Sequence, residues 1–209
     1  MKKFILFNLF LAGFILIFLG GCAKKEEEKN MLKIMSEKQV LLIIAFDGYQ
    51  DKEYEDTRVE LESSGVKIML ASNSKGMAHG SLGGSINVNL LISEVKADQY
   101  DAIIFIGGPG AAVAFQKNSE AHRLAKEAIS QNKILAAICI GPTILAKAGV
   151  LKNKKATVWS SLMDKSPIEI LKQNGAEYVD QNVVVDGKII TANGPSAAKD
   201  FGKTIVKKL

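Results

Sequence analysis

The sequence predicts an α/β fold in which a doubly wound, mostly parallel sheet is covered by helices on both faces, in three layers. Short, continuously apolar runs alternate with segments of helical periodicity, and Gly, Pro or Asn residues separate them. Of the 209 residues, 47% are hydrophobic, so the chain can bury a full core. This alternation is typical of parallel sheets built from strand–helix–strand units.

The first predicted strand covers residues 40–46, an uninterrupted apolar run. A helix is expected over 51–64, because Gly65 follows its last periodic residue. A second strand is expected over 66–71. The segment 77–90 is rich in Gly, Ser and Asn with alternating apolar residues, which indicates a small hairpin.

The third strand, 102–106, ends in Gly107-Gly108-Pro109-Gly110. Ser119 is expected to cap a helix that continues to about Gln131. The fourth strand, 134–138, leads directly into Cys139. The remaining expected elements are a helix over 140–148, a strand near Thr157, a helix over 168–173, a hairpin of 178–185 with 188–192, and a closing helix from Pro195.

The amino-terminal segment differs from the rest of the chain. Two lysines precede an apolar run over 4–19, and Gly20-Gly21-Cys22 follows, which is the layout of a secretory signal. The ending resembles the lipobox of bacterial lipoproteins, and an uncleaved anchor helix is the alternative. We expect residues 1–21 to be a signal peptide and 22–38 a polar tether. A lipid on Cys22 would hold the domain, 39–209, on the extracytoplasmic face of a membrane.

Charge and cysteine content argue against two further classes of protein. The net charge of +5 arises from lysines scattered among acidic residues, which gives little support to nucleic-acid binding. The chain has two cysteines, and lipidation would use Cys22, so a domain cross-linked by disulfides is excluded. Cys139 would then be the free thiol of the mature protein.

Cys139 stands between a predicted strand and a predicted helix, as the nucleophile of a strand–turn–helix elbow does. Such a turn crowds its neighbours, and the residues two before and two after are the small Ala137 and Gly141. The first amides of the following helix would favour the thiolate. The alternative interpretation is a structural cysteine buried in an apolar strand.

Two other segments follow predicted strands and are expected near Cys139, because ligands of such sheets bind beyond the carboxyl ends of the strands. Main-chain amides of Gly108 and Ile140 can point at one substrate oxygen, although Gly107–Gly110 alone would be read as an ordinary turn. Glu53 opens the first helix, where a carboxylate usually serves the helix dipole. Beside Cys139, a semi-buried carboxyl can instead exchange a proton with sulfur or substrate.

These motifs resemble the PfpI/DJ-one superfamily. They are Ala-Ala-Ile-Cys-x-Gly-Pro around Cys139, Gly-Gly-Pro-Gly at 107–110, and Gly-Tyr-Gln-Asp-Lys-Glu at 48–53, and the similarity covers about 39–209. The resemblance implies a flavodoxin-like sheet and a homodimer. It also implies a reactive cysteine at Cys139, a buried glutamate at Glu53, and oxyanion-binding amides at Gly108 and Ile140.

Two positions depart from the superfamily's pattern. Ile140 stands where members that act as proteases or amidases have a histidine after the cysteine. Trp159 is the nearest match to the histidine that other members place near the nucleophile. His79 and His122 are the only histidines in the chain, and we expect both on the surface.

The resulting hypothesis is an enzyme that acts on a small reactive carbonyl compound, as a glyoxalase or deglycase, through a Cys139 hemithioacetal with Glu53 moving the proton. It requires neither cofactor nor metal. One alternative is a redox-responsive, protein-protecting module whose Cys139 is oxidised. Another is a peptidase or amidase, which the missing histidine disfavours. A binding lipoprotein without chemistry would need a second lobe that this length does not supply.

Overall fold

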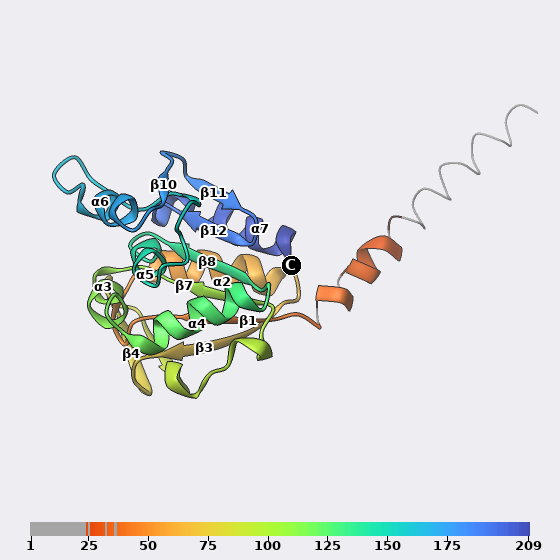
Figure 1. The fold of residues 1–209 in the computed structure, drawn as a ribbon. Helices are drawn as coiled ribbons and strands as arrows, with labels where there is room; N and C mark the ends of the chain where they lie inside the picture. Colours follow the sequence, from red (N-terminus) through yellow and green to blue (C-terminus); the bar gives the residue numbers. More distant parts are fainter. Residues whose placement is uncertain (1–23, 25, 32, 36) are drawn as a thin grey trace, which may run out of the picture.

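The computed structural model describes residues 24, 26–31, 33–35 and 37–209, so the expected signal peptide and Cys22 lie outside the described residues. The described residues of 24–35 are helical (Figure 1), and of these Met35 is buried. Within the described part of the chain, no helix has the length and apolar character needed to cross a membrane.

A seven-stranded sheet forms the centre of the domain (Figure 1). In spatial order its strands are β11 (Val183–Asp186), β12 (Ile189–Ala192), β8 (Ile134–Ile138), β7 (Ala102–Phe105), β1 (Gln39–Ile43), β3 (Lys67–Ser72) and β6 (Leu90–Leu91). Neighbouring strands are parallel except β11, which pairs antiparallel with β12. The predicted doubly wound, mostly parallel sheet is therefore confirmed.

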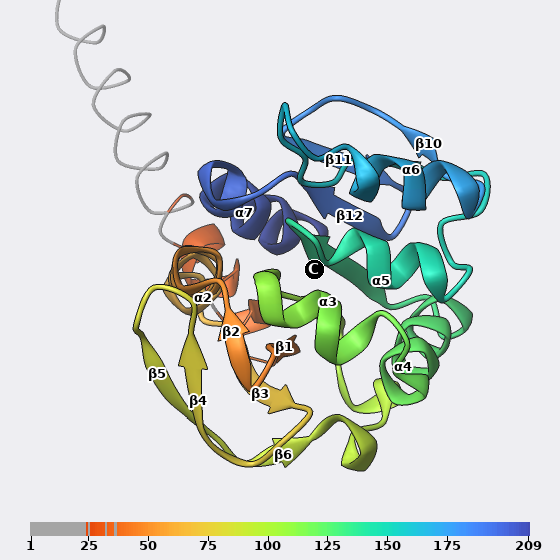
Figure 2. The same cartoon turned by 90° about the vertical axis from the view of Figure 1, so that its left-hand side faces the viewer.

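Helices cover both faces of this sheet, as Figure 2 shows. On one face, α2 (Asp51–Ser63) packs with α7 (Ala198–Lys208). On the other lie α3 (Pro109–Phe115), α4 (Ser119–Ser130), α5 (Pro142–Lys147) and α6 (Ser166–Gln173). Alternate residues of β1 enter the two cores, Leu41 and Ile43 one and Val40 and Leu42 the other, because successive strand side chains point to opposite faces. The three layers follow from this alternation.

Small sheets and short 3₁₀ turns complete the domain. The first small sheet contains β2 (Asp47–Tyr49), β4 (Gly76–Gly80) and β5 (Ser85–Val88), so the hairpin expected within 77–90 is confirmed. The second contains β9 (Lys155–Ala156) and β10 (Glu177–Tyr178). The 3₁₀ turns are η1 (Ile92–Glu94), η2 (Ala97–Gln99) and η3 (Pro195–Ala197).

The strand register brings the carboxyl ends of the central strands to one edge. Ile43 of β1 lies beside Phe105 of β7, which in turn lies beside Ala137 of β8. The segments that follow these strands therefore emerge side by side. These are the segments in which the sequence places Glu53, Gly108 and Cys139.

Several predicted boundaries are wrong for identifiable reasons. The helix α3 was not expected, because its glycines and proline indicate a turn; Pro109 occupies its first turn, where the missing N–H costs nothing. The cap of α4 is Asn118, whose Oδ1 accepts the N–H groups of Glu120 and Ala121 at 2.9 and 3.1 Å, and Ser119 is already helical. Tyr178 belongs to β10, so the last hairpin begins only at Val183.

Candidate active site

Cys139 lies at the end of β8 in a left-handed backbone conformation, with φ of 61°. This conformation costs a non-glycine residue about 1–2 kcal/mol, so the surrounding structure must hold it. The Cys139 N–H donates to the carbonyl of Ala192 at 2.9 Å, and the N–H of Trp159 donates to the carbonyl of Cys139 at 2.9 Å. Two neighbouring segments thus fix the peptide groups on either side of the cysteine.

The small residues around Cys139 are there because the turn leaves no room. A Cβ on Gly141 would lie 2.9 Å from the carbonyl oxygen of Ile138 and 3.2 Å from the Cβ of Ala137. The spacing of Ala137, Cys139 and Gly141 therefore describes a true elbow. Cys139 itself is 8% exposed at this apex, and is not sealed within β8.

Glu53 lies in the first turn of α2, and its side chain is completely buried. The side chain of Gln50 accepts the Glu53 N–H at 3.0 Å and so fixes the start of the helix. The N–H of Gly107 donates to Glu53 Oε2 at 3.1 Å. The other oxygen, Oε1, is buried, and the Cys139 thiol acts on the carboxyl as a hydrogen-bond donor that lowers the pKa of Glu53.

Burial raises the pKa of Glu53 from 4.5 to about 7, and the hydrogen bonds from Cys139 and Gly107 offset only part of this shift. Near neutral pH the carboxyl therefore populates both protonation states. A group with this property can take a proton and return it within one catalytic cycle.

The pKa of Cys139 is raised, which corrects the expectation that the helix amides would favour the thiolate. Burial is the largest cause, and the negative charge and hydrogen bond of Glu53 add to it. The backbone N–H groups of Gly108 and Ile140 bond the sulfur and lower its pKa, but by less. The Cys139 thiol is therefore protonated near neutral pH, and the titratable side chain next to it is Glu53.

The backbone N–H groups of Gly108 and Ile140 both reach the Cys139 sulfur, and the oxyanion-binding role that the resemblance implies for them stays a prediction. Gly108 has φ of 108°, and a Cβ there would lie 2.5 Å from the backbone nitrogen of Gln50. At Gly107, a Cβ would lie 2.5 Å from the Cβ of Cys139 and 2.7 Å from Glu53 Oε2. Both glycines are thus required for the close approach of three segments.

Neither histidine acts on this site. His79 is exposed on β4, and His122 Nε2 bonds the carbonyl of Gln116 at 3.1 Å. The position that resembles a histidine position in other members holds Trp159, whose half-buried side chain packs on the same core cluster as Cys139. Glu53 remains the titratable side chain that interacts with the Cys139 thiol.

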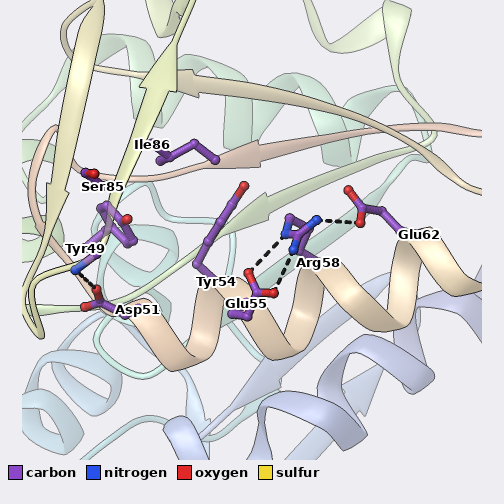
Figure 3. Close-up of a pocket in the computed structure, with 9 residues that line it drawn as sticks. Tyr49, Asp51, Tyr54, Glu55, Arg58, Glu62, Ser85 and Ile86 are labelled. Atoms are coloured by element: carbon purple, nitrogen blue, oxygen red, sulfur yellow. Dashed lines mark hydrogen bonds and ion pairs between the residues drawn. The ribbon is translucent and has the colours of Figure 1, made fainter.

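A cavity of about 430 Å³ lies elsewhere, between α2 and β5 (Figure 3). It is lined by Tyr49, Asp51, Tyr54, Glu55, Arg58, Glu62, Gly84, Ser85 and Ile86. Arg58 is held by Glu55 at 2.7 Å and Glu62 at 2.5 Å, and the Asp51 carboxylate accepts the N–H groups of Leu82 and Gly84. The charged side chains Arg58 and Asp51 are therefore engaged in structural contacts. The strained thiol and the buried acid lie instead at the Cys139 site.

Sequence reasoning missed Gln50 and Gly107. Gln50 could have been found as a polar residue three positions before Glu53 at a helix start. Gly107 was part of a recognised glycine motif, but its bond to Glu53 depends on tertiary contact. The described residues contain no group of three or more His, Cys, Asp or Glu side chains arranged to hold a metal ion.

Comparisons with known proteins agree with this architecture. The family model described as DJ-1/PfpI matches residues 38–208. An uncharacterised protein of Methanocaldococcus jannaschii is 39% identical over 90% of this chain and 89% of its own length. A deglycase of Thermococcus kodakarensis is 32% identical over 81% of this chain and 98% of its own.

Solved structures show the same fold. A ThiJ/PfpI domain protein of Brachyspira murdochii has a TM-score of 0.76 and 34% identity, covering 81% of this chain and 94% of its own. The DJ-1beta protein of Drosophila melanogaster has a TM-score of 0.74 and 31% identity, covering 82% of this chain and 90% of its own.

Proposed function

Since the chain belongs to the DJ-1/PfpI family, we propose that it is a cysteine-dependent enzyme acting on small reactive carbonyl compounds, as a glyoxalase or deglycase. The observation that carries the proposal is the contact between the strained Cys139 thiol and the buried Glu53 carboxyl, whose pKa of about 7 suits a proton carrier.

Named relatives support the same class of reaction. The relative from Thermococcus kodakarensis is named a deglycase. A relative from Caenorhabditis elegans, 27% identical over 83% of this chain and 90% of its own length, is named a glutathione-independent glyoxalase. Both names describe chemistry on reactive carbonyl compounds.

In the proposed first step, the Cys139 sulfur attacks the aldehyde carbon of an α-oxoaldehyde while the thiol proton passes to Glu53. The new C–S bond gives a hemithioacetal, and the amides of Gly108 and Ile140 hold its oxygen. Because the resting thiol is not ionised, the ionised form of Glu53 is the active base.

Glu53 then returns the thiol proton to the hemithioacetal oxygen and is again a carboxylate. In the second step, it moves the proton from the aldehyde carbon to the neighbouring carbonyl carbon, through an enediol, which leaves a thioester of a 2-hydroxy acid. One water then cleaves the C–S bond and restores the thiol. The aldehyde carbon is oxidised and its neighbour reduced, so the reaction needs no external oxidant and consumes one water.

The direct test is conversion of methylglyoxal to lactate by purified protein without glutathione. The proposal expects turnover by the wild type and none by Cys139→Ala, with the two proteins matched in their circular dichroism spectra. Absence of turnover by clean, folded wild-type protein on both methylglyoxal and glycated substrates overturns the proposal.

A redox-responsive role is the second candidate, and the same contacts favour it. A protonated Glu53 and the two amides that reach the sulfur can bond the oxygens of a Cys139 sulfinic acid. Mass spectrometry after mild peroxide treatment tests it: a stable gain of two oxygens on the Cys139 peptide supports this role, and an unmodified thiol removes it.

Peptidase or amidase activity is the weakest candidate. Expelling an amine requires a general acid beside the nucleophile, and both histidines have other surroundings. Glu53 would have to serve alone. Hydrolysis of casein or of an aminopeptidase substrate by wild type but not by Cys139→Ala would revive it.

The cellular setting is a separate proposal. We infer from the sequence that a lipid on Cys22 anchors the chain to the extracytoplasmic face of a membrane, and from the family resemblance that two copies form a homodimer. Mass spectrometry of the amino-terminal peptide tests the lipid, and sedimentation of detergent-solubilised protein tests the dimer. An unmodified Cys22 or a monomer would contradict the respective statement.

A further inference from the structure

Trp159 has a side chain that the proposed reaction does not use, and its backbone is hydrogen-bonded to the reactive cysteine. Its main-chain N–H donates to the carbonyl of Cys139 at 2.9 Å. That carbonyl belongs to the same peptide group as the Ile140 N–H, one of the two amides that reach the sulfur. The Trp159 backbone therefore orients an oxyanion donor.

The indole of Trp159 has an equally defined place. It is half-buried and packs on the core cluster that contains Cys139 and Ala192. A Cβ on Gly194, which has φ of 144°, would lie 3.4 Å from the indole Cδ1. Gly194 thus leaves room for the indole, and part of the Trp159 side chain remains accessible.

The electrostatic surroundings of the site restrict what can bind next to the indole. The negatively charged group that acts on the Cys139 thiol is Glu53, whose side chain is completely buried. A substrate carboxylate or phosphate held beside the thiol would therefore lie close to a buried acidic group, which is unfavourable. Ile140, half-buried at the elbow, adds a further apolar surface.

Resting on the proposed glyoxalase chemistry, we propose that Trp159 determines the substrate range, forming an apolar wall that selects uncharged α-oxoaldehydes with a flat apolar substituent. Aromatic pairs contribute about 0.5–1.5 kcal/mol beyond the area that they bury. The indole should therefore act through KM for such substrates, while its backbone N–H, which any residue supplies, maintains kcat.

The test compares phenylglyoxal with methylglyoxal in the full chain and in Trp159→Ala and Trp159→Phe. We expect Trp159→Ala to raise KM for phenylglyoxal about fivefold, the size of one aromatic contact, with kcat retained and KM for methylglyoxal much less affected. Trp159→Phe should restore most of the loss. An equal loss for both substrates, or a fall in kcat alone, would show a purely structural role and overturn the proposal.

Two further measurements keep the proposal testable if Trp159→Ala does not fold or if turnover is absent. Hydroxypyruvaldehyde phosphate, a charged oxoaldehyde, should be a poor substrate for the wild type. Turnover of this compound as fast as that of methylglyoxal would contradict the selection of uncharged substrates. Trp159 is the sole tryptophan of the chain, so its fluorescence reports occupancy of the site directly.

In the Cys139→Ala protein, which cannot form the hemithioacetal, phenylglyoxal should quench this fluorescence at lower concentration than methylglyoxal. Equal quenching by the two would overturn the inference about Trp159. Absence of turnover by the wild type together with selective quenching would instead reject the proposed reaction and leave Trp159 as a binding wall.

Discussion

A residue in the left-handed conformation flanks each end of β8, and the surroundings of these two residues differ. At the amino end, Asn132 has φ of 55°, is exposed, and lies in the tight turn after α4. At the carboxyl end, Cys139 has φ of 61°, is almost buried, and contacts a buried acid. The first turn uses a residue type that tolerates this conformation, whereas the second does not.

The difference shows where the molecule stores strain. Around Asn132, the Lys133 N–H donates to the carbonyl of Ala128 at 2.8 Å, which is a local helix ending. Around Cys139, the holding contacts come from Ala192 and Trp159, distant in sequence. A functional site is indicated where long-range contacts hold an unfavourable backbone conformation beside an acid whose pKa is shifted. An Asn in the left-handed conformation in a surface turn indicates only that the turn links two elements.

The largest expected effect is the difference in activity between substitutions at the two ends of β8. Cys139→Ala should reduce oxoaldehyde turnover to the uncatalysed background, because no other described residue at the site offers a nucleophile. Asn132→Ala, the matched control, should keep wild-type kcat and KM. Steady-state kinetics of both variants check this, and residual turnover by Cys139→Ala would mean that Glu53 and the amides act without a covalent intermediate.

Glu53→Gln should remove activity and add stability at the same time. Loss of a general acid–base typically lowers rate by about 10²–10⁴-fold. Because the pKa of Glu53 rises from 4.5 to about 7 on folding, the folded chain binds more protons than the unfolded chain between these values, and the wild type loses stability as pH rises through this window.

Removing this buried charge should therefore stabilise the variant above pH 7 by up to about 3 kcal/mol relative to its behaviour at pH 4. Urea unfolding of both proteins at the two pH values measures this difference. A stability difference that does not change with pH would contradict the raised pKa.

Gly107→Ala should reduce activity, whereas Gly187→Ala in a surface turn should not, although the backbone conformation at Gly187 is the less favourable one for alanine. The new Cβ would lie 2.5 Å from the Cβ of Cys139, so activity should be lost and stability should fall by about 1–3 kcal/mol. Gly187→Ala, in the last hairpin with φ of 62° and open space around it, should cost about 1–2 kcal/mol but leave kinetics unchanged. Kinetics together with thermal unfolding distinguish the two, and an active Gly107→Ala would mean that the site tolerates displacement.

The smallest effect is expected at Asn132. Asn132→Gly should change the free energy of unfolding by only a few tenths of a kcal/mol, because glycine adopts this conformation freely. Asn132→Ala should cost about 1 kcal/mol. Urea unfolding curves resolve the pair, and equal stability of both variants would show that this turn relaxes without strain.

Apolar periodicity and strand ends are local signals, so the sequence was sufficient for the architecture and for placing Glu53 and Cys139 at the same edge of the sheet, although Gln50 and Gly107 were missed. The strands at 40–46, 102–106 and 134–138 lie within about three residues of the observed bounds, and their ends bring Glu53 and Cys139 together. The direction in which the pKa of the Cys139 thiol shifts could not be predicted in the same way. Helix amides are visible in the sequence, but burial and the approach of a carboxyl are tertiary properties.

The state of the Cys139–Glu53 pair is tested most directly by the rate of Cys139 alkylation with iodoacetamide as a function of pH, in wild type and in Glu53→Gln. Because the carboxylate raises the pKa of the thiol, the midpoint should lie above the ordinary value of about 8.5 in the wild type and move to lower pH in Glu53→Gln. A midpoint near 8.5 that is the same in both proteins would contradict the coupling of thiol and carboxyl.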